Sequence, residues 1–385
     1  MLRNSTAIVG VGYTEFSTCS GVTTLTLATR AIMAALADAG LTVSDVDGLA
    51  SHGVNDSTSP HLVAAALGVR QLNYYVDQFG GGSTSHSVLG NAAMAVATGV
   101  ADTVVCYRAI NSRSGIRQGR TGTKAGPTGG VEEQYKAPYG FVAAVPAFAM
   151  LARAHMTKYG TTPEDLGAIS INQRHNASLN ERAMLRTPIT LDDYLGSRTI
   201  ADPLRLLDCC LETDGACAIV VTSVDRARHL PHRPVVIGGA VWGGGTTLLS
   251  TGRADLTETA VSQYLAKRLY SMSGIGPTEV DVAQLYDCFT ITVLLQLEEY
   301  GFCKPGEGGD LVRSGATGLD GALPVNTHGG FLSEGYIHGL NHVAEAVSQL
   351  RGTAGARQVP GAEVALSTGQ PGIIAGYSSA VMLHV

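Results

Sequence analysis

A stretch of isolated basic side chains is the first feature of this sequence that could bind a ligand. Between residues 112 and 130 the chain has no acidic residue and four cations, Arg113, Arg117, Arg120 and Lys124. Guanidinium and ammonium groups pair with phosphate oxygens, so this glycine-rich stretch could hold the phosphates of a long anionic ligand. A polar loop with a run of charge is equally typical of a solvated surface loop. The sequence alone leaves both interpretations open.

Seven cysteines and a triple glycine are the next candidates for chemistry. The cysteines are odd in number and lack the CxxC spacing of zinc sites, so we expect reduced, mostly buried thiols and no metal. The run Gly80, Gly81 and Gly82 lacks the Gly-Lys-Ser/Thr signature of a phosphate-binding loop. These residues therefore predict neither a metal site nor a nucleotide site.

Composition and charge exclude several classes of protein. A net charge of −6 argues against nucleic acid as the main partner, because phosphate binding depends on a basic surplus. No apolar run reaches about 18 residues and the first residues lack a secretory apolar segment, so we expect a cytoplasmic protein without membrane insertion. Only 15% of the residues are charged, against about 25% in typical domains. Part of the surface is therefore expected to lie against another subunit or partner.

The elements that must position any site follow an α/β pattern that occurs twice. Short β-rich runs bounded by glycine alternate with amphipathic Ala/Leu segments, which indicates an α/β chain. In the first part we expect strands at 7–12 and 103–107 and helices at 25–39 and 85–98. Matching elements follow later, with strands at 234–239 and 363–367 and helices at 257–273 and 340–351. This repetition predicts two duplicated halves, residues 1–232 and 233–385.

The first half is longer than the second because of an expected insertion at about 111–208. It opens with the basic stretch and continues with two segments of helical spacing, 146–159 and 163–179. The second segment begins with Thr162-Pro163-Glu164-Asp165, the pattern of an N-cap followed by proline and acidic residues. We therefore expect a loop region with helices between the strands of the first half.

Five motifs are spread along the whole chain: KAPYG at 136–140, KYGTTPEDL at 158–166, TDGACA at 213–218, YDCFT at 286–290, and NTHGG at 326–330 followed by SEG at 333–335. In this order and spacing they resemble the thiolase superfamily, and more closely its lipid-transfer-protein (sterol-carrier-protein) thiolase branch. The resemblance implies a thiolase fold, with two duplicated βαβαβ halves in a five-layered αβαβα arrangement and a loop-domain insertion in the first half. It does not by itself imply a reaction, because one fold supports many chemistries.

The residues that thiolases use for catalysis are missing. The resemblance places Gly80, within about one residue, where the family has its nucleophilic cysteine, and no cysteine follows Cys303, although the family has a second one near the C-terminus. Without a thiolate at that position the usual acyl-enzyme cannot form. Tyr336 takes the place of the histidine in the family's Gly-His-Pro motif, and Tyr286 that of the histidine in the branch's His-Asp-Cys-Phe motif.

This pattern resembles the thiolase-like steroid side-chain aldolases, which lack the catalytic cysteines and have tyrosines in the pocket. The resemblance implies retro-aldol cleavage of a β-hydroxyacyl-CoA, a steroid side-chain 17-hydroxy-20-carboxyl-CoA that gives a 17-ketosteroid and propionyl-CoA. Such a step needs a base for the hydroxyl, stabilisation of the thioester enolate and an acid for its carbon, but no covalent intermediate. We expect Tyr286 and Tyr336 to face each other and to serve as acid and base, in an order that the sequence does not assign. The ordinary pKa of a phenol is about 10, so the base needs help from its surroundings.

Further site residues are expected in two glycine-rich turns and in a nearby histidine. The resemblance locates the family's oxyanion holes at the turns that hold Gly80, Gly81 and Ser83 and, near the C-terminus, Gly372. Backbone N–H groups there could bind the thioester oxygen. His338 could tune a phenol or donate a hydrogen bond to the thioester. The basic stretch, residues 112–130, would contact either the CoA phosphates or a partner.

The resemblance also implies protein partners, and two alternative functions stay open. Coenzyme A enters as part of the acyl-CoA substrate, so no cofactor is expected. The resemblance implies a homodimer and a zinc-containing OB-fold partner of the DUF35 type, associated with a hydratase. One alternative is a thiolase or condensing enzyme with an unusual nucleophile such as Cys288. Another is a lipid-binding or scaffold subunit without catalytic activity.

Overall fold

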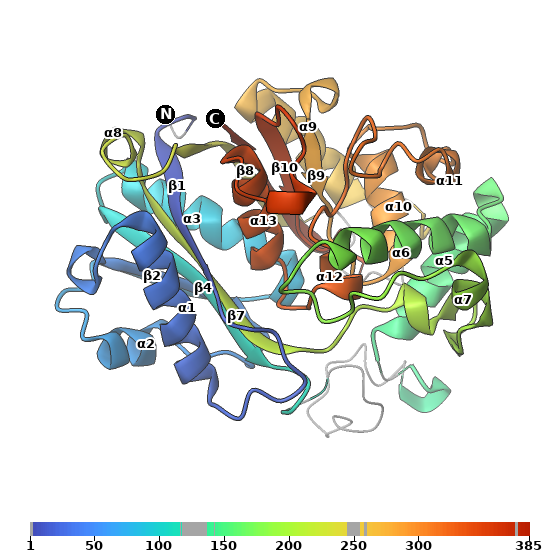
Figure 1. Ribbon diagram of the computed structural model, residues 1–385, viewed down its shortest axis with the longest axis horizontal. Coiled ribbons are helices and arrows are strands. Elements are labelled where there is room, and N and C mark those ends of the chain that lie inside the picture. Colours follow the sequence, from blue (N-terminus) through green and yellow to red (C-terminus); the bar gives the residue numbers. More distant parts are fainter. Residues whose placement is uncertain are drawn as a thin grey trace.

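A nine-stranded sheet forms the centre of the molecule (Figure 1). The computed structural model describes residues 3–115, 117, 137–141, 143–244, 255–257, 260–373 and 376–385. The strands lie in the order β3-β2-β4-β7-β1-β8-β11-β10-β9. Their bounds are β1 Thr6–Tyr13, β2 Gly48–Gly53, β3 Tyr74–Phe79, β4 Thr103–Asn111, β7 Asp214–Ser223, β8 Val235–Gly244, β9 Val282–Gln284, β10 Val364–Thr368 and β11 Tyr377–His384. A separate small sheet pairs β5 (Thr199–Ala201) with β6 (Leu204–Arg205).

The strand order repeats on the two sides of the central β1–β8 pair. Moving outward, each side has the first strand of its half, then the last, the last but one and the second. β2 is parallel to β3 and β4, as β9 is to β10, whereas β7 and β11 are antiparallel to their neighbours. The topology confirms the expected duplication. The exact boundary after residue 232 stays a prediction, and it falls between α8 (Val224–Ala227) and β8.

Helices form the remaining layers. Their bounds are α1 Thr24–Ala39, α2 Pro60–Leu67, α3 Ser85–Ala97, α5 Val145–Tyr159, α6 Pro163–Ser178, α7 Leu191–Gly196, α9 Ala260–Ser273, α10 Thr290–Glu299, α11 Gly308–Arg313, α12 Gly330–Ser333 and α13 Leu340–Leu350. Most expected bounds agree within a few residues because local signals set them. Thr23 caps the start of α1, and Gly40 ends it with a φ of +67°.

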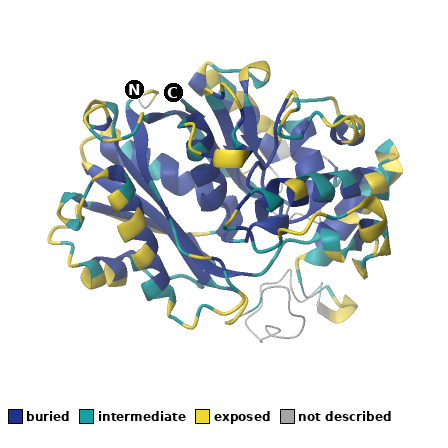
Figure 2. Ribbon diagram, viewed as in Figure 1, coloured by how far each residue is buried: buried dark blue, intermediate teal, exposed yellow. Residues whose placement is uncertain are grey.

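Alternating side chains divide the interior into layers. In β1, Ala7 and Val9 pack into the core beneath α1, whereas Ile8 packs into a second core with α3 and α13. α3 and α13 contact strands of both halves and form the middle layer. α1 covers the outer face of the first half-sheet and α9 that of the second. The expected five-layered αβαβα arrangement is thereby confirmed, and Figure 2 shows the strands as its buried part.

The insertion of the first half packs against the second half. α6 contacts α10, α11 and α12, and α5 contacts α10 (Figure 1). The α6 N-terminus has a capping box in which Thr162 and Asp165 exchange hydrogen bonds. On α5, His155 is buried and its Nε2 lies 3.2 Å from Glu298 on α10. The inserted helices therefore form one wall of the region where the two halves meet.

Loops from both halves converge at one edge of the sheet. Parallel strands place their carboxyl ends together, and binding sites of α/β sheets lie outside those ends. The turn after β3 meets the loop after β10, since the Gln370 N–H donates to the carbonyl of Gly82 at 3.0 Å. The loop after β9 carries Tyr286. Within the described part of the chain, no helix has the length and apolar character needed to cross a bilayer.

Candidate active site

Two phenol groups meet at the junction of the two halves. The hydroxyl oxygens of Tyr286 and Tyr336 lie 2.8 Å apart, a hydrogen bond in which either oxygen can be the donor. Tyr286 is 1% exposed, and Tyr336 is half-buried. Their rings meet edge to face with centroids 6.3 Å apart, and both rings also contact Phe331 edge to face. The expected juxtaposition of the two tyrosines is therefore present.

Three side chains hold the backbone of Tyr286 by hydrogen bonds. Its N–H donates to the Thr368 hydroxyl at 3.1 Å. Its carbonyl accepts from the Thr292 hydroxyl at 2.8 Å and from the Gln296 amide at 2.7 Å. Since all three partners are buried, these bonds are shielded from water. The loop after β9 is thus a rigid support for the phenol.

Tyr336 is held by a single threonine. The Thr213 hydroxyl accepts from the Tyr336 N–H at 2.9 Å and donates to the Tyr336 carbonyl at 3.0 Å. Thr213 is fully buried just before β7, so the first half of the chain orients a residue of the second half. The motif at 213–218 therefore has a direct role in building the site.

Burial keeps both phenols neutral. It raises the pKa of Tyr286 well above the ordinary value, and the neighbouring Tyr336 adds to that rise. Burial likewise raises the pKa of Tyr336, while the hydrogen bond from Tyr286 and the positive charge of Arg108 act in the opposite direction. A charged phenolate in this pocket would lack the solvation that water supplies. The resting site is therefore a hydrogen-bonded pair of neutral phenols.

The glycine-rich turn after β3 approaches the pair more closely at Gly82 than at Gly80. A Cβ added to Gly82 would lie 1.8 Å from the Tyr286 hydroxyl oxygen, whereas one at Gly80 would meet Thr84 and Tyr377. Gly82 thus provides the space that the buried phenol occupies. Residues Gly81–Ser83 form a 3-10 turn directly before α3. The first N–H groups of such a helix start have no partner within it and can face an anion.

The second glycine-rich turn is tied to the first. The Ser83 hydroxyl donates to Gln370 Oε1 at 3.1 Å, and the same oxygen accepts the Gly372 N–H at 2.8 Å. Gly81 lies beside the His338 ring. The expected proximity of the two turns is present, but the Gly372 N–H is engaged by Gln370, so we assign it a role in holding the turns together and not in binding oxygen.

His338 belongs to a buried charge cluster that sequence reasoning missed. Its Nδ1 lies 2.8 Å from Arg108 Nη2 and 3.2 Å from Arg108 Nε, and the same Nη2 donates to Asp56 at 2.7 Å. The His338 ring also meets the Tyr336 ring edge to face at 4.8 Å. A charged residue in the apolar strand run 103–110 was the signal that could have identified Arg108.

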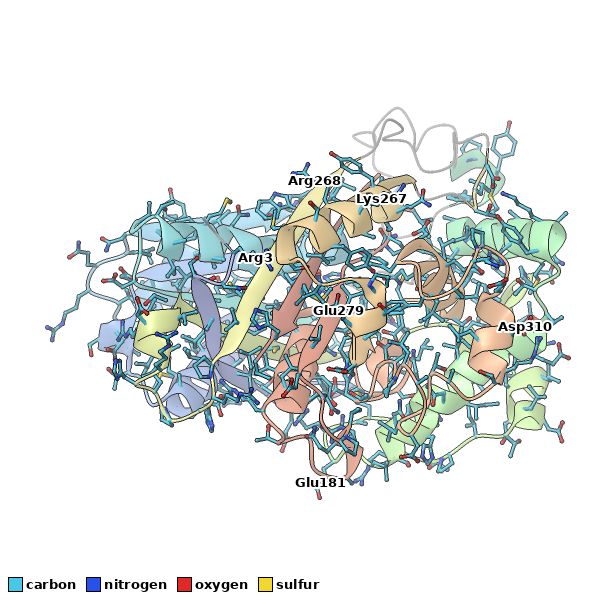
Figure 3. The ribbon with its side chains drawn as sticks, turned by 90° about the horizontal axis from the view of Figure 1, so that it is seen from above. Arg3, Glu181, Lys267, Arg268, Glu279 and Asp310 are labelled. Carbon is cyan, nitrogen blue, oxygen red and sulfur yellow. The ribbon has the colours of Figure 1, made fainter. Side chains whose placement is uncertain are left out.

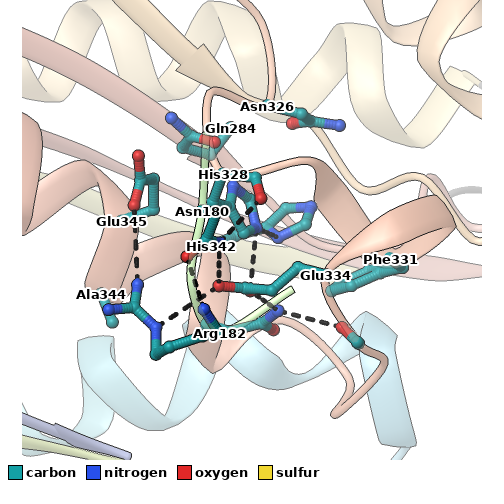
Figure 4. A network of polar contacts seen from close by, with 12 residues as sticks. Asn180, Arg182, Gln284, Asn326, His328, Phe331, Glu334, His342, Ala344 and Glu345 are labelled. Atoms are coloured by element: carbon teal, nitrogen blue, oxygen red, sulfur yellow. Dashed lines mark hydrogen bonds and ion pairs between the residues drawn. The ribbon is translucent and has the colours of Figure 1, made fainter. Parts of the chain in front are cut away.

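Figure 4 shows a buried polar network that includes His328, Glu334 and His342. Both Asp287 oxygens accept backbone N–H groups at the start of α12, from Phe331 at 3.0 Å and Leu332 at 3.1 Å. His342 stacks on Phe331 with centroids 4.0 Å apart, and its Nδ1 lies 3.1 Å from His328 Nε2. These contacts fix Phe331 against both phenols. His328 is therefore a structural residue, and burial lowers its pKa well below the ordinary value.

Glu334 and Glu345 connect this network to the insertion. Glu334 accepts amide hydrogens from Asn180 and Asn341, each at 2.9 Å. Arg182, which is in the insertion, lies 3.6 Å from Glu334 and 4.0 Å from Glu345. Both carboxylates are fully buried, and Glu345 has closer partners in Arg357 at 3.0 Å and the Thr327 hydroxyl at 2.8 Å. The labelled charged side chains of Figure 3, by contrast, lie at the exterior.

The basic stretch is described only in part. The Arg113 backbone N–H donates to Asp214 at 2.9 Å and its side chain is exposed. Arg117 forms an ion pair with Glu212. Arg120 and Lys124 lie outside the described residues. An anion that binds Arg117 would compete with Glu212, and the role of this stretch stays a prediction.

The thiols near the tyrosines are poor nucleophiles. Burial raises the pKa of Cys288 well above the ordinary value, and Asp287 adds to the rise. Burial raises the pKa of Cys210 in the same way. Attack by cysteine requires the thiolate, which this pocket disfavours. Among the described residues no group of three or more His, Cys, Asp and Glu side chains could hold a metal ion.

Comparisons with known proteins identify the family of this chain. Residues 244–384 match the family model of the thiolase C-terminal domain-like family. The 17-hydroxy-3-oxo-4-pregnene-20-carboxyl-CoA lyase of Mycobacterium tuberculosis is 46% identical over 97% of this chain and 98% of its own. The steroid side-chain-cleaving aldolase of Thermomonospora curvata is 44% identical over 92% of each chain. The solved Ltp2-ChsH2(DUF35) aldolase superposes with a TM-score of 0.93 at 41% identity, over 100% of this chain and 98% of the other.

The fold and the matched family model define a member of the thiolase superfamily. The chain belongs to the family of steroid side-chain-cleaving aldolases in the sterol-carrier-protein branch of that superfamily. It is a carbon–carbon lyase, which confirms the class of reaction that the sequence analysis expected.

Proposed function

We propose that Tyr286 and Tyr336 carry the proton in a retro-aldol cleavage of a β-hydroxyacyl-CoA. The main support is their 2.8 Å hydrogen bond in a buried pocket. The raised pKa of the nearby Cys288 thiol argues against a displaced thiolate nucleophile. Membership of an aldolase family argues against a scaffold without catalytic activity.

The bond that breaks joins the α carbon of the thioester to the carbon that bears the hydroxyl. The electron pair of the O–H bond forms the new ketone, and the pair of the carbon–carbon bond becomes the enolate of the leaving acyl-CoA. The hydroxyl proton finally reaches the enolate carbon. The reaction therefore consumes no water and no oxidant, and both phenols can end as they began.

A relay through neutral phenols satisfies this balance. Tyr286 takes the substrate proton while it passes its own to Tyr336, and Tyr336 gives its proton to carbon. Two contacts support this order, because they lower the pKa of Tyr336 against the effect of burial and so favour it as the acid. They are the hydrogen bond with the Tyr286 hydroxyl and the Arg108 charge. No free phenolate has to form, which agrees with the raised pKa of both groups. General acid–base steps of this kind contribute about 10²- to 10⁴-fold in rate.

The developing enolate also needs a donor for its oxygen. The N–H groups at the start of the turn, at Gly81 and Gly82, are suited to it because they precede α3, and because Gly82 lies next to Tyr286 and Gly81 next to His338. Ser83 keeps the turn attached to Gln370. Gly80, whose N–H donates to the Gly53 carbonyl at 2.9 Å, shapes the turn but donates elsewhere.

The proposed substrate is a steroid side-chain 17-hydroxy-20-carboxyl-CoA, and the proposed products are a 17-ketosteroid and propionyl-CoA. The support is the 46% identical lyase, whose name describes such a thioester. Coenzyme A then arrives as part of the substrate and no further cofactor is required. Arg113, Arg117, Arg120 and Lys124 would contact its phosphates or the partner protein.

The proposed assembly is a cytoplasmic homodimer with a DUF35-type, zinc-containing OB-fold partner. The similarity to the Ltp2-ChsH2(DUF35) aldolase supports the partner. The edge strand β3 supports the dimer, because Tyr75 is 55% and Phe79 is 65% exposed on a strand with one open side. These surfaces would also account for the low charged fraction of the chain.

Product analysis tests this proposal. The chain, alone and co-expressed with an OB-fold partner, is mixed with the steroid β-hydroxyacyl-CoA, and ketone and propionyl-CoA are quantified by mass spectrometry. We expect equal amounts of the two products and no acyl adduct in the intact protein mass. The analogue without the hydroxyl is the matched control and should remain uncleaved. An acylated protein, or no ketone in either preparation, would contradict the proposal.

A further inference from the structure

Arg108 is a cation in the interior of the first half-sheet. It lies on β4 and its side chain is fully buried. A buried guanidinium needs partners for its N–H groups, because it cannot give up its proton and has no water to solvate it. Its Nη1 donates to the Ala109 carbonyl at 3.3 Å, and Nη2 donates to Asp56 at 2.7 Å. The remaining contacts, from Nη2 and Nε, go to His338 Nδ1.

The contact between a guanidinium and an imidazole determines which ring nitrogen of His338 has the proton. A guanidinium only donates, so His338 Nδ1 has to accept and is unprotonated. In a neutral imidazole the proton is then on Nε2. His338 therefore has one donor, Nε2–H, and it faces away from Arg108.

The backbone and ring position of His338 point to use of this donor. His338 has a φ of +63°, a left-handed conformation that is costly for a residue other than glycine and is concentrated at functional sites. Its Nε2 lies 3.7 Å and its Cε1 3.6 Å from where a Cβ on Gly81 would be. The ring edge thus lies beside the glycine turn, and the ring meets the Tyr336 ring at an interplanar angle of 80°.

We propose that the Arg108–Asp56 pair holds His338 as a neutral Nε2–H donor to the thioester oxygen, where negative charge develops when the carbon–carbon bond breaks. His338 is then a catalytic residue of the retro-aldol step, and Arg108 and Asp56 are positioning residues that act through it. A neutral imidazole is a suitable electrophile because it can donate to an enolate without transferring its proton. The catalytic role of His338 rests on the proposed function, which supplies the substrate. The position of the proton on His338 does not depend on that function.

The charges around His338 favour the neutral ring. Burial lowers the pKa of His338 to about 3, and the Arg108 charge acts in the same direction. Asp56, whose own pKa is lowered to about 2, opposes this effect. The other titratable rings beside it are Tyr336 in the same loop and His52 on β2, with centroids 4.8 and 6.4 Å away. Burial also lowers the pKa of His52 well below the ordinary value.

The first test reads the proton position directly. The chain has 11 histidines, so selective ¹⁵N-histidine labelling gives a tractable spectrum, and the signals absent from His338→Asn identify His338. We expect Nδ1 to be unprotonated and Nε2 protonated from about pH 5.5 to 8, because burial lowers the pKa of His338 to about 3, well below this range. In Arg108→Gln, or in Arg108→Gln/Asp56→Asn if the single variant does not fold, the proton should no longer be confined to Nε2, and the signals of both neutral tautomers should appear. A proton on Nδ1 in the unmodified chain, or no change in either variant, would overturn the proposal.

The second test measures the reaction. Asparagine accepts a left-handed backbone, so His338→Asn removes the imidazole without adding strain. We expect kcat to fall by about 10²- to 10³-fold, as for other lost oxyanion donors, with little change in KM. Arg108→Gln should lower kcat, because the proton of His338 is then no longer confined to Nε2. Near-normal kcat in His338→Asn would overturn the catalytic role. Absence of lyase activity in the unmodified enzyme would instead contradict the proposed function, while the spectrum would still test the proton position.

Discussion

Gly82 leaves the space in which the Tyr286 hydroxyl lies, and a single methyl group there should disrupt the site. The Cβ of Gly82→Ala would begin 1.8 Å from the Tyr286 oxygen and 2.2 Å from its Cζ. Real Cβ contacts almost never fall below 3.0 Å, so the phenol or the turn has to move by about 1.2 Å. A displacement of about 1 Å in a catalytic geometry can cost about 10²-fold in rate. We expect a loss of that size in kcat and about 1–3 kcal/mol of destabilisation.

The assay compares Gly82→Ala with a matched glycine elsewhere. Gly82 has no left-handed φ, so alanine adds no backbone strain and the effect reports the contact alone. Gly196→Ala is the control, since a Cβ there meets nothing within 4 Å and the φ is again ordinary. Turnover of the steroid thioester and thermal unfolding are measured for both. Turnover of Gly82→Ala near the level of Gly196→Ala would refute the reasoning.

Three further predictions concern the support of the site, the dimer and acid stability. Thr213→Val removes both hydrogen bonds to Tyr336, so we expect about 1–3 kcal/mol lower unfolding free energy by denaturant titration and a lower kcat. Phe79→Lys adds charge to the open edge of β3 and should shift the proposed dimer to monomer in light scattering. His86 and His338, each with a pKa of about 3, stabilise the fold above pH 6.5 by staying neutral. As the pH falls below 6.5 towards 3, the unfolding free energy should therefore decrease, by at most about 1.4 kcal/mol per pH unit for each histidine. A flat acid stability profile would contradict their buried neutral state.

Much of the fold could be predicted because local patterns determine it. The α1 helix was expected at 25–39 and occupies Thr24–Ala39, since Thr23 caps its start and Gly40 adopts the left-handed conformation that ends it. The duplication was readable from repeated elements, and the strand order bears it out. The α9 helix was expected at 257–273; residue 257 lies in a turn, residues 258 and 259 are outside the described part of the chain, and the described helix is Ala260–Ser273.

The site was predicted in part. The pairing of Tyr286 with Tyr336 followed from their positions in family motifs. The sequence did not predict which glycine of the turn lies against the Tyr286 hydroxyl; it is Gly82, and the direction of each Cα–Cβ bond in a turn depends on backbone angles that the sequence does not display. The Gly372 N–H was expected to bind oxygen but is engaged by Gln370.

Arg108 shows what pattern reasoning overlooks. It lies within an apolar strand run, where its neighbours predict burial and its own charge predicts exposure. Its partners Asp56 and His338 are 52 and 230 residues away in the chain, so only the folded structure brings them together. A lone cation in a buried strand is therefore a useful signal for a built polar site.

The central claim is that two neutral phenols act as one relay, and a double-mutant cycle tests it most directly. Single-turnover rates of bond cleavage are measured for the unmodified enzyme, Tyr286→Phe, Tyr336→Phe and the double variant, each with its OB-fold partner. A relay is broken by the loss of either phenol, so each single variant should lose about 10² or more and the double variant should lose no more than the worse single one. Losses that multiply in the double variant, or near-normal cleavage in either single variant, would contradict the account.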